Sequence, residues 1–285
     1  MGMNLVLQSV SGDLATRGSI NAIASDARAK SVTPLSAHAW RFEDVSYSDT
    51  VRRSVHARAH ADALDSAFVA PGQRLADFRL VVMDMDSTLI TIECIDEIAD
   101  MHGLKPQVAA ITEAAMRGEL DFRESLTRRV ALLQGLDAGA LQRVVDERLE
   151  LSPGAETMLA AVKAAGLRTL LVSGGFTYFT ERMQARLGLD ATRANVLEIA
   201  DGRLTGKVIG DIVDSEAKQR AVLESCTALG IAPRQAIVIG DGANDLKMMA
   251  IAGMSVAFHA KPLVREKADV ALNFVGLDGI LALFE

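Results

Sequence analysis

Two carboxylates stand directly after a short apolar run, and this junction constrains the fold more than any other feature of the sequence. The run Leu80–Met83 is followed by Asp84 and Asp86, and then by the hydroxyl pair Ser87 and Thr88. A short, β-branched apolar run predicts a buried strand, and ligands of open α/β sheets bind at the carboxyl ends of such strands. Burial of two carboxylates is unfavourable unless another group compensates them. The segment therefore predicts a site at a strand end, with a strand followed by an Asp-rich turn as the alternative.

A second apolar run closes on a hydroxyl and two glycines. Leu170–Val172 is followed by Ser173, Gly174 and Gly175, and then by a stretch of helical spacing that begins at Phe176. Glycine allows backbone N–H groups to approach an anion closely, and the N-terminus of a helix attracts negative charge. The pattern predicts a phosphate-binding turn, with a flexible strand-to-helix turn as the alternative.

Two further segments carry charged side chains. Lys218 lies early in a helical segment that begins near Asp214, a suitable N-cap residue. By itself, a lysine at such a position is interpreted as a solvated residue on the helix surface. The apolar run Ala236–Gly240 ends in a polar turn that contains Asp241, Asn244 and Asp245. Carboxylates gathered at one sheet edge repel one another unless a cation lies among them. The sequence therefore predicts a metal site that involves Asp84, Asp86, Asp241 and Asp245. Hard oxygen donors with no Cys or His nearby favour Mg²⁺ over Zn²⁺.

These segments together resemble the motifs of haloacid-dehalogenase-type phosphotransferases. In chain order the matching motifs are Asp84-Met-Asp86-Ser-Thr88, Ser173-Gly174-Gly175, Lys218 and Gly240-Asp241-Gly-Ala-Asn244-Asp245. Within that superfamily the chain is most similar to the phosphoserine phosphatases, because the segment 92–97 reads Ile-Glu-Cys-Ile-Asp-Glu and continues as a helical insert. The resemblance spans roughly Leu75 to Glu285.

The resemblance implies a role for each motif residue. Asp84 is implied as a nucleophile that forms an aspartyl-phosphate, and Asp86 as the general acid and base. Mg²⁺ is implied on the Asp84 carboxylate, the Asp86 backbone carbonyl and Asp241, with Asn244 and Asp245 completing the shell. The remaining phosphate oxygens are implied to contact Ser173, Gly174 and Lys218.

The insert between the first two motifs is the candidate for substrate selection. Apolar residues recur at helical spacing in 106–117, 122–133 and 138–149, so residues 94–151 predict a small helical cap. By resemblance, Glu93 binds the substrate ammonium, Arg129 binds its α-carboxylate, and Met116 and Phe122 form walls of the pocket. Arginine matches a carboxylate with two parallel hydrogen bonds. The alternative for Arg129 is a solvated helix face, because Arg128 and Glu124 lie close to it in the sequence.

Composition restricts the class of protein. With 285 residues, 49% of them hydrophobic and 24% charged, the chain can bury a sizeable core in one large or two modest domains. The net charge of −7, without a basic block, argues against nucleic-acid or anionic-membrane partners. The sequence contains two cysteines, no signal peptide and no run of apolar residues long enough to span a bilayer, so we expect a cytoplasmic protein.

Strand and helix patterns alternate after the insert. Ser152 and Pro153 predict the start of a helix, and the later elements are expected at 168–172, 176–189, 195–199, 203–208, 216–229, 236–240, 254–258 and 269–272. Asp201 and Gly202 predict a hairpin turn. We expect an α/β fold with a doubly wound, mostly parallel sheet of the haloacid-dehalogenase-like type over residues 75–285. His259, which follows one of these strands, is expected to be structural.

Residues 1–74 predict a small N-terminal α+β domain. Strands are expected at 3–8 and 38–42, a helix at 20–29 and a helical or mixed stretch at 51–68. In related phosphatases such extensions resemble ACT-like amino-acid-binding or dimerising modules. No glycine-rich ligand turn supports binding here, so we expect a role in packing or homodimer formation. His56 and His60 have the spacing of a helical metal pair, but the neighbouring arginines would repel a cation.

The motifs together with this resemblance imply a Mg²⁺-dependent phosphatase that releases L-serine from O-phospho-L-serine, a small-molecule substrate, in serine biosynthesis. One alternative is a related phosphatase for another small phosphomonoester, such as phosphothreonine or a sugar phosphate. The alternative outside enzymes is a phosphoamino-acid-binding sensor, which would gain little from having both a nucleophile and an acid.

Overall fold

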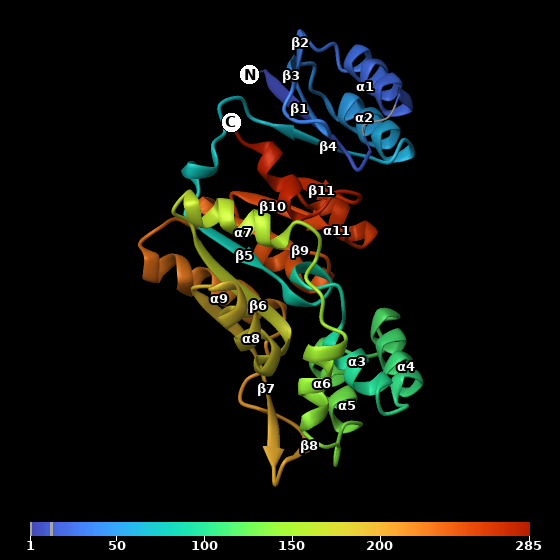
Figure 1. Ribbon diagram of the computed structural model, residues 1–285, viewed down its shortest axis with the longest axis vertical. Helices are drawn as coiled ribbons and strands as arrows, with labels where there is room; N and C mark the ends of the chain where they lie inside the picture. Colours follow the sequence, from blue (N-terminus) through green and yellow to red (C-terminus); the bar gives the residue numbers. More distant parts are fainter. Residues whose placement is uncertain (1, 12–13) are drawn as a thin grey trace. The chain divides into compact units, whose positions relative to one another are not determined.

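The computed structural model describes residues 2–11 and 14–285 (Figure 1). The chain divides into two compact units, and each is described by itself. The first unit contains Met1–Val81, Pro153–Leu167 and Arg234–Glu285, and the second contains Val82–Ser152 and Arg168–Pro233.

The N-terminal part of the first unit is a four-stranded antiparallel sheet with two helices. Its elements are β1 (Met3–Ser9), α1 (Leu14–Asp26), β2 (Ser31–Pro34), β3 (Ala39–Val45), α2 (Asp49–Ala61) and β4 (Leu64–Val69), with strand order β2-β3-β1-β4. This is the βαββαβ arrangement of ferredoxin-like folds. Ile23 of α1 and Val55 of α2 pack in one core with Leu5 and Phe42 of the strands, so both helices cover the same face of the sheet (Figure 1).

The structure confirms the predicted elements of this part in outline and adds one strand, since the strands expected at 3–8 and 38–42 are β1 and β3. The mixed stretch at 51–68 is a helix followed by a strand, α2 and β4, and the helix expected at 20–29 is α1, which begins at Leu14. Strand β2 was not predicted, because all four of its residues are exposed and their pattern carries no apolar alternation.

A seven-stranded sheet forms the core, in the order β11-β10-β9-β5-β6-β7-β8. Its strands are β5 (Leu80–Met83), β6 (Arg168–Phe176), β7 (Ala191–Ala200), β8 (Arg203–Ile209), β9 (Ala236–Gly240), β10 (Met254–Phe258) and β11 (Val270–Leu272). The helices between them are α7 (Ala155–Ala164), α8 (Thr177–Leu187), α9 (Ser215–Leu229), α10 (Leu246–Met249) and α11 (Pro262–Lys267). β10 pairs in parallel with β9 and with β11, whereas β7 and β8 form an antiparallel hairpin. The predicted doubly wound, mostly parallel fold is confirmed.

The start of α7 differs from the prediction. Helix α7 begins at Ala155, and Gly154 before it has φ +77°, so Ser152 and Pro153 precede the helix instead of capping it. A Cβ atom on Gly154 would lie 2.1 Å from Oδ1 of Asp278, which explains why this turn requires glycine.

The cap in the second unit contains the helices α3 (Cys94–Asp100), α4 (Lys105–Met116), α5 (Phe122–Ala131) and α6 (Gly139–Glu147). The last three begin within one residue of the predicted starts, since amphipathic spacing and local caps fix them. Asp121 illustrates this, because its side chain accepts a hydrogen bond from the N–H of Glu124 at 2.8 Å and so caps α5.

The cap is joined to the hairpin of β7 and β8 by backbone hydrogen bonds. The pairs are Gly135 N to Leu204 O at 2.8 Å, Leu204 N to Leu136 O at 2.9 Å, and Ala138 N to Gly202 O at 2.9 Å. The guanidinium of Arg203 donates to the carbonyl of Gly135 at 2.8 Å. The hairpin tip and the loop between α5 and α6 therefore form one hydrogen-bonded layer (Figure 1).

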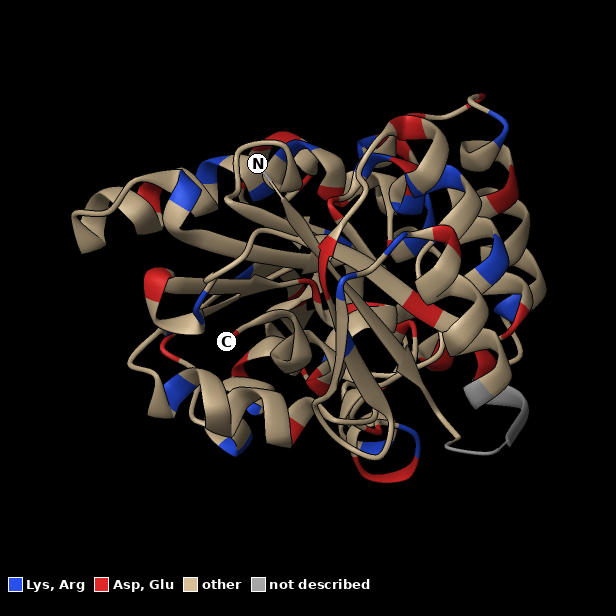
Figure 2. Cartoon of the chain, turned by 90° about the horizontal axis from the view of Figure 1, so that it is seen from above, with Lys and Arg blue, Asp and Glu red and all other residues tan. Residues whose placement is uncertain are grey.

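Charged residues of both signs share the surface helices. Figure 2 shows Lys and Arg next to Asp and Glu on the same helices, as expected for solvated faces. Within the described part of the chain, no helix is both long and apolar enough to cross a bilayer.

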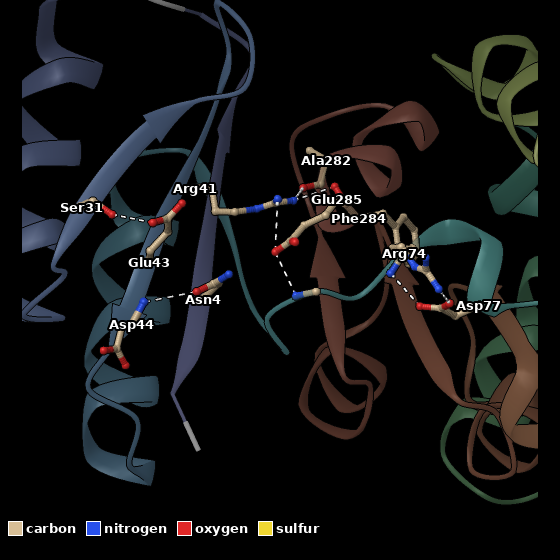
Figure 3. A network of polar contacts seen from close by, with 11 residues as sticks. Asn4, Ser31, Arg41, Glu43, Asp44, Arg74, Asp77, Ala282, Phe284 and Glu285 are labelled. Carbon is tan, nitrogen blue, oxygen red and sulfur yellow. Dashed lines mark hydrogen bonds and ion pairs between the residues drawn. The ribbon is translucent and has the colours of Figure 1, made fainter.

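Within the first unit, Arg41 of β3 joins the N-terminal sheet to the segment that follows β11. Its Nη2 donates to the carbonyls of Phe284 at 2.6 Å and Ala282 at 3.2 Å, and its Nη1 lies 3.7 Å from a carboxylate oxygen of Glu285 (Figure 3). The same Glu285 side chain accepts a hydrogen bond from the N–H of Gly72 at 3.0 Å. Arg41 is only 7% exposed, and these contacts compensate the charge at its two terminal nitrogens, whereas its buried Nε has no hydrogen-bond partner among the described residues.

Because the cap and the hairpin pack closely at Gly206, we expect Gly206→Ala to lower the free energy of unfolding. Gly206 has φ +80°, and a Cβ atom there would lie 2.9 Å from Cβ of Gln134 and 3.3 Å from Cα of Ala131. We expect the variant to lose about 1–3 kcal/mol of unfolding free energy from this overpacking, in addition to the backbone strain. The matched control is Gly210→Ala, which has a similar φ of +76° but no atom within 4 Å. Urea unfolding of both variants would measure the difference, and equal losses would contradict the proposed contact.

Candidate active site

Asp84 and Lys218 form a buried ion pair in the second unit. Nζ of Lys218 lies 2.8 Å from Oδ2 of Asp84, with the lysine side chain 0% and the aspartate side chain 7% exposed. Oδ1 of Asp84 accepts a hydrogen bond from the N–H of Met85 at 2.7 Å. Asp214 caps α9 by accepting from the N–H of Ala217 at 2.9 Å, and so fixes the first turn that carries Lys218. The solvated-lysine alternative is therefore wrong.

Asp86 lies one residue further along the same turn, in a different environment. Its Oδ1 accepts from the N–H of Cys94 at 3.0 Å, and its Oδ2 accepts from Oγ of Ser173 at 3.2 Å. Burial raises the pKa of Asp86, although the hydrogen bonds of Cys94 and Ser173 and the charge of Lys218 partly oppose the rise. Asp84 is thus paired directly with a lysine, whereas Asp86 accepts hydrogen bonds from uncharged groups. This difference suits the two carboxylates to different chemical roles.

The two glycines of the predicted phosphate turn are required by close packing. A Cβ atom on Gly175 would lie 2.5 Å from Oδ2 of Asp86, and one on Gly174 would lie 2.9 Å from Cζ of Phe122. Oγ of Ser173 accepts a hydrogen bond from the N–H of Gly175 at 2.8 Å. Strand β6 extends through these residues to Phe176, beyond the predicted end at 172. The turn therefore brings Ser173 and Gly175 close to Asp86, and Gly174 close to the cap residue Phe122.

Glu93 and Arg129 lie on the cap side of the same region. Glu93 is the residue before α3, and its Oε1 accepts from Oγ of Ser87 at 2.8 Å. Burial lowers the pKa of Arg129, and the negative charges of Asp96, Glu93 and Asp86 act in the opposite direction. Arg129 is therefore partly buried and lies near several carboxylates.

The neighbouring arginines of α5 behave differently from Arg129. Arg128 is 55% exposed and pairs with Glu124 at 2.6 Å, and Arg123 is 51% exposed and pairs with Asp214 at 2.7 Å. The solvated face predicted as the alternative for Arg129 is thus formed by these two residues instead.

Met116 lies apart from the predicted site residues described above. It is the last residue of α4 and is 72% exposed, so the structure does not place it in a pocket wall. Its predicted contact with substrate stays a prediction.

The turn after β9 is shaped by its own acidic residue. Oδ2 of Asp245 accepts a hydrogen bond from the N–H of Gly242 at 3.1 Å, and Asp245 is fully buried. A Cβ atom on Gly240 would lie 2.4 Å from Oδ2 of Asp245, and one on Gly242 would lie 2.2 Å from Oδ1 of Asn244. The glycines of this motif therefore make room for the carboxylate and amide groups that follow them.

The acidic groups of the motifs form a donor set that fits a hard cation. One carboxylate oxygen from each of Asp84, Asp241 and Asp245 lies within 4.8 Å of the others. Such a cluster of oxygen donors suits Mg²⁺, which prefers carboxylates and keeps part of its water shell.

Comparison with known proteins identifies the family. The family model of haloacid dehalogenase-like hydrolases matches residues 81–250. The chain belongs to this family. It is 56% identical over 236 residues to a phosphoserine phosphatase of Albidiferax ferrireducens, which covers 81% of this chain and 100% of that protein. The resemblance inferred from the four motifs is therefore confirmed.

Solved structures of the hydrolase family extend the similarity beyond the matched segment. A family member from Salmonella enterica serovar Typhi superposes with a TM-score of 0.90 at 32% identity, covering 99% of both chains. A probable phosphoserine phosphatase from Vibrio cholerae gives a TM-score of 0.83 at 35% identity, covering 99% of this chain and 86% of that one.

Sequence reasoning missed Asn195, a supporting residue of the phosphate turn. Its Nδ2 donates to the carbonyl of Gly174 at 2.7 Å, and its Oδ1 accepts from the N–H of Val213 at 2.8 Å. Asn195 is 1% exposed. Its only sequence signal is a polar residue within a predicted strand, which by itself does not indicate a partner.

We expect Asn195→Ala to destabilise the fold and loosen the phosphate turn. Loss of the side chain leaves the buried N–H of Val213 and carbonyl of Gly174 unpaired, which costs about 1–3 kcal/mol. Binding of inorganic phosphate should weaken as well, because Gly174 loses its anchor. Thermal unfolding with and without phosphate measures both effects. Asn21→Ala, at an exposed position of α1, is the control and should change neither; unchanged phosphate binding in Asn195→Ala would contradict the supporting role.

Proposed function

We propose that this hydrolase is a Mg²⁺-dependent phosphatase that converts O-phospho-L-serine to L-serine and phosphate in L-serine biosynthesis. The observation that carries the proposal is the pair of carboxylates after β5. Asp84 is paired with buried Lys218, whereas burial raises the pKa of Asp86. A charge-compensated nucleophile next to a carboxyl group whose pKa is raised is the arrangement that suits acid–base chemistry through a covalent intermediate. The phosphoserine phosphatase of A. ferrireducens and the other similar phosphatases support the substrate.

The proposed reaction has two displacements at phosphorus. In the first, an oxygen of Asp84 attacks phosphorus, the bond to the serine oxygen breaks, and that oxygen takes the proton held by Asp86. In the second, water attacks the aspartyl-phosphate, Asp86 accepts a proton from this water, and the bond to Asp84 breaks to release phosphate. General acid–base assistance of this kind typically contributes about 10²–10⁴-fold.

The remaining motif residues have proposed roles as ligands. The Asp84 carboxylate, the Asp86 backbone carbonyl, Asp241 and Asp245 would hold Mg²⁺, which supplies compensation for negative charge on the phosphoryl oxygens. The proposed phosphate contacts are Ser173, Gly174, Lys218 and Asn244.

Substrate selection is assigned to the cap side. Arg129 would bind the α-carboxylate, Glu93 the ammonium, and Phe122 and Met116 would cover the substrate. The support for Arg129 is its partly buried position near several carboxylates of the cap side, where a substrate carboxylate could accept two hydrogen bonds from the guanidinium. Exposed Met116 would have to move with α4 to reach the substrate.

The proposed organisation comprises an N-terminal domain at 1–74, a catalytic core at 75–285 and a cap at about 94–151. The βαββαβ order of the N-terminal part supports an ACT-like module that packs or mediates homodimer formation. We further propose a cytoplasmic location, since serine biosynthesis uses soluble metabolites.

The proposal predicts phosphate release from phosphoserine only when Mg²⁺ is present. A panel of phosphoserine, phosphothreonine, sugar phosphates and p-nitrophenyl phosphate, with and without Mg²⁺, tests substrate and metal together. Asp84→Asn should abolish turnover, and Asp84→Glu, which keeps the charge opposite Lys218, should also be inactive although it folds. A preference for phosphothreonine or a sugar phosphate would assign another substrate. Binding without turnover would indicate a sensor, and activity of Asp84→Asn would remove the nucleophile.

Arg129→Ala should act selectively on phosphoserine. Loss of a charged double hydrogen bond is expected to lower kcat/KM for phosphoserine by roughly 10–100-fold, while p-nitrophenyl phosphate, which has no carboxylate, should be hydrolysed nearly as before. The matched control is Arg128→Ala on the exposed face of the same helix. Equal losses on both substrates would show that Arg129 does not bind the carboxylate.

A further inference from the structure

The N-terminal sheet contributes one buried carboxylate whose hydrogen bonds all go to a loop of the core. Asp65 of β4 is 1% exposed. Its Oδ1 accepts from the backbone N–H of Asn273 at 2.6 Å and from Nδ2 of the same residue at 3.2 Å, and its Oδ2 accepts from the N–H groups of Phe274 at 2.9 Å and Val275 at 3.0 Å. Charged acceptors form the stronger class of hydrogen bonds, so Asp65 fixes the three residues that follow β11.

The same three-residue loop is held on its other side by His259. The N–H of His259 donates to the carbonyl of Leu272 at 2.7 Å, and its ring Nε2 lies 3.0 Å from the carbonyl of Val275. Since a carbonyl only accepts, the ring nitrogen is the donor. His259 has φ +45°, a left-handed conformation that is uncommon for residues other than glycine. The loop 273–275 thus lies between Asp65 and the turn that begins at His259.

That turn leads directly to the proposed metal ligand Asp241. The N–H of Lys261, two residues after His259, donates to the backbone carbonyl of Asp241 at 3.2 Å. Strands β9 and β10 pair in parallel with Gly240 opposite Ala257, so both turns leave the sheet side by side. Asp65 is therefore connected to the backbone of Asp241 by hydrogen bonds to loop 273–275, by the bonds of that loop to His259, and by the short backbone segment from His259 to Lys261.

We propose that Asp65 is a positioning residue for Asp241, so that the N-terminal part of the chain helps to set the affinity of the site for Mg²⁺. The inference rests on the proposed function, in which Asp241 holds the ion. Mg²⁺ demands near-ideal octahedral geometry, and partners beyond the direct ligands commonly change metal affinity by about 10–100-fold. A small displacement of the turn at Asp241 would therefore weaken binding even though Asp65 never approaches the ion.

The test is Mg²⁺ binding to Asp65→Asn, measured by calorimetry with the metal alone. The amide keeps the size of the carboxylate but turns an NH₂ group toward backbone N–H donors, which cannot accept it. We expect about tenfold weaker Mg²⁺ binding, with KM for phosphoserine nearly unchanged at saturating Mg²⁺. Wild-type affinity for Mg²⁺ in a folded Asp65→Asn protein would overturn the proposal.

A second variant keeps the test valid if Asp65→Asn does not fold. His259 is exposed, and His259→Asn removes the ring bond to Val275 while asparagine tolerates the left-handed backbone. This variant should also bind Mg²⁺ more weakly. In the double variant, the loss of Mg²⁺ binding free energy should be smaller than the sum of the two single losses, because both changes interrupt the same connection to Asp241. Unchanged Mg²⁺ affinity in His259→Asn, or full additivity, would contradict the proposed path.

Arg41→Met is the control that separates positioning from attachment. Arg41 joins the same N-terminal sheet to Ala282 and Phe284, which lie beyond loop 273–275 (Figure 3). Arg41→Met should lower the unfolding temperature and leave Mg²⁺ affinity unchanged. Equal losses of Mg²⁺ affinity in Arg41→Met and Asp65→Asn would assign the effect to attachment in general and overturn the specific role of Asp65.

Asp241→Asn distinguishes failure of this inference from failure of the proposed function. It should bind Mg²⁺ far more weakly than the wild type. If Asp241→Asn binds Mg²⁺ as the wild type does, the metal role of Asp241 is wrong, and the role of Asp65 falls with it. If Asp241→Asn binds Mg²⁺ weakly while Asp65→Asn and His259→Asn bind it as the wild type does, the proposed function stands and the positioning role of Asp65 is overturned.

Discussion

The buried pair of Asp84 and Lys218 is the interaction on which the candidate site depends. Both charges are removed from water, and each is tolerated because the other lies 2.8 Å away. The pair fixes the end of β5 against the first turn of α9, and the N-cap Asp214 holds that turn. Removing one partner of a buried pair typically costs about 3–5 kcal/mol. Charge compensation therefore links the position of the proposed nucleophile to the folding of two distant segments.

Close approach of backbone and carboxylate explains the glycines around this pair. Gly175 lies against Asp86 and Gly240 lies against Asp245, each closer than any Cβ atom would permit. The acidic side chains in turn accept backbone hydrogen bonds from the same segments, as Asp86 does from Cys94 and Asp245 does from Gly242. The motif residues thus stabilise their own turns before any ligand binds, and the polar groups of the site are held in place beforehand, which favours electrostatic catalysis.

The N-terminal part is connected to the core by polar groups at two separate places. Arg41 donates to carbonyls of Ala282 and Phe284, whereas Asp65 accepts from the loop 273–275. Of these two attachments, only that of Asp65 is made to a loop that bonds to His259, and the backbone that follows His259 bonds through the N–H of Lys261 to the carbonyl of Asp241. The proposed influence of the N-terminal part on the candidate site depends on the backbone of this one loop.

The sequence by itself determined most of the elements and the kinds of side chain that follow the strand ends. Apolar runs ending in polar turns located β5, β6 and β9, and helical spacing located α4 to α6, because these signals depend on residues close together in the chain. Tertiary structure decided which of Arg123, Arg128 and Arg129 leaves the solvent, and it revealed the roles of Asn195 and Asp65. Their partners lie many residues away, so local pattern could not identify them. Strand β2 was not predicted for a related reason. Its four residues are exposed, and its strand conformation depends on hydrogen bonding to β3, which a local apolar pattern does not reveal.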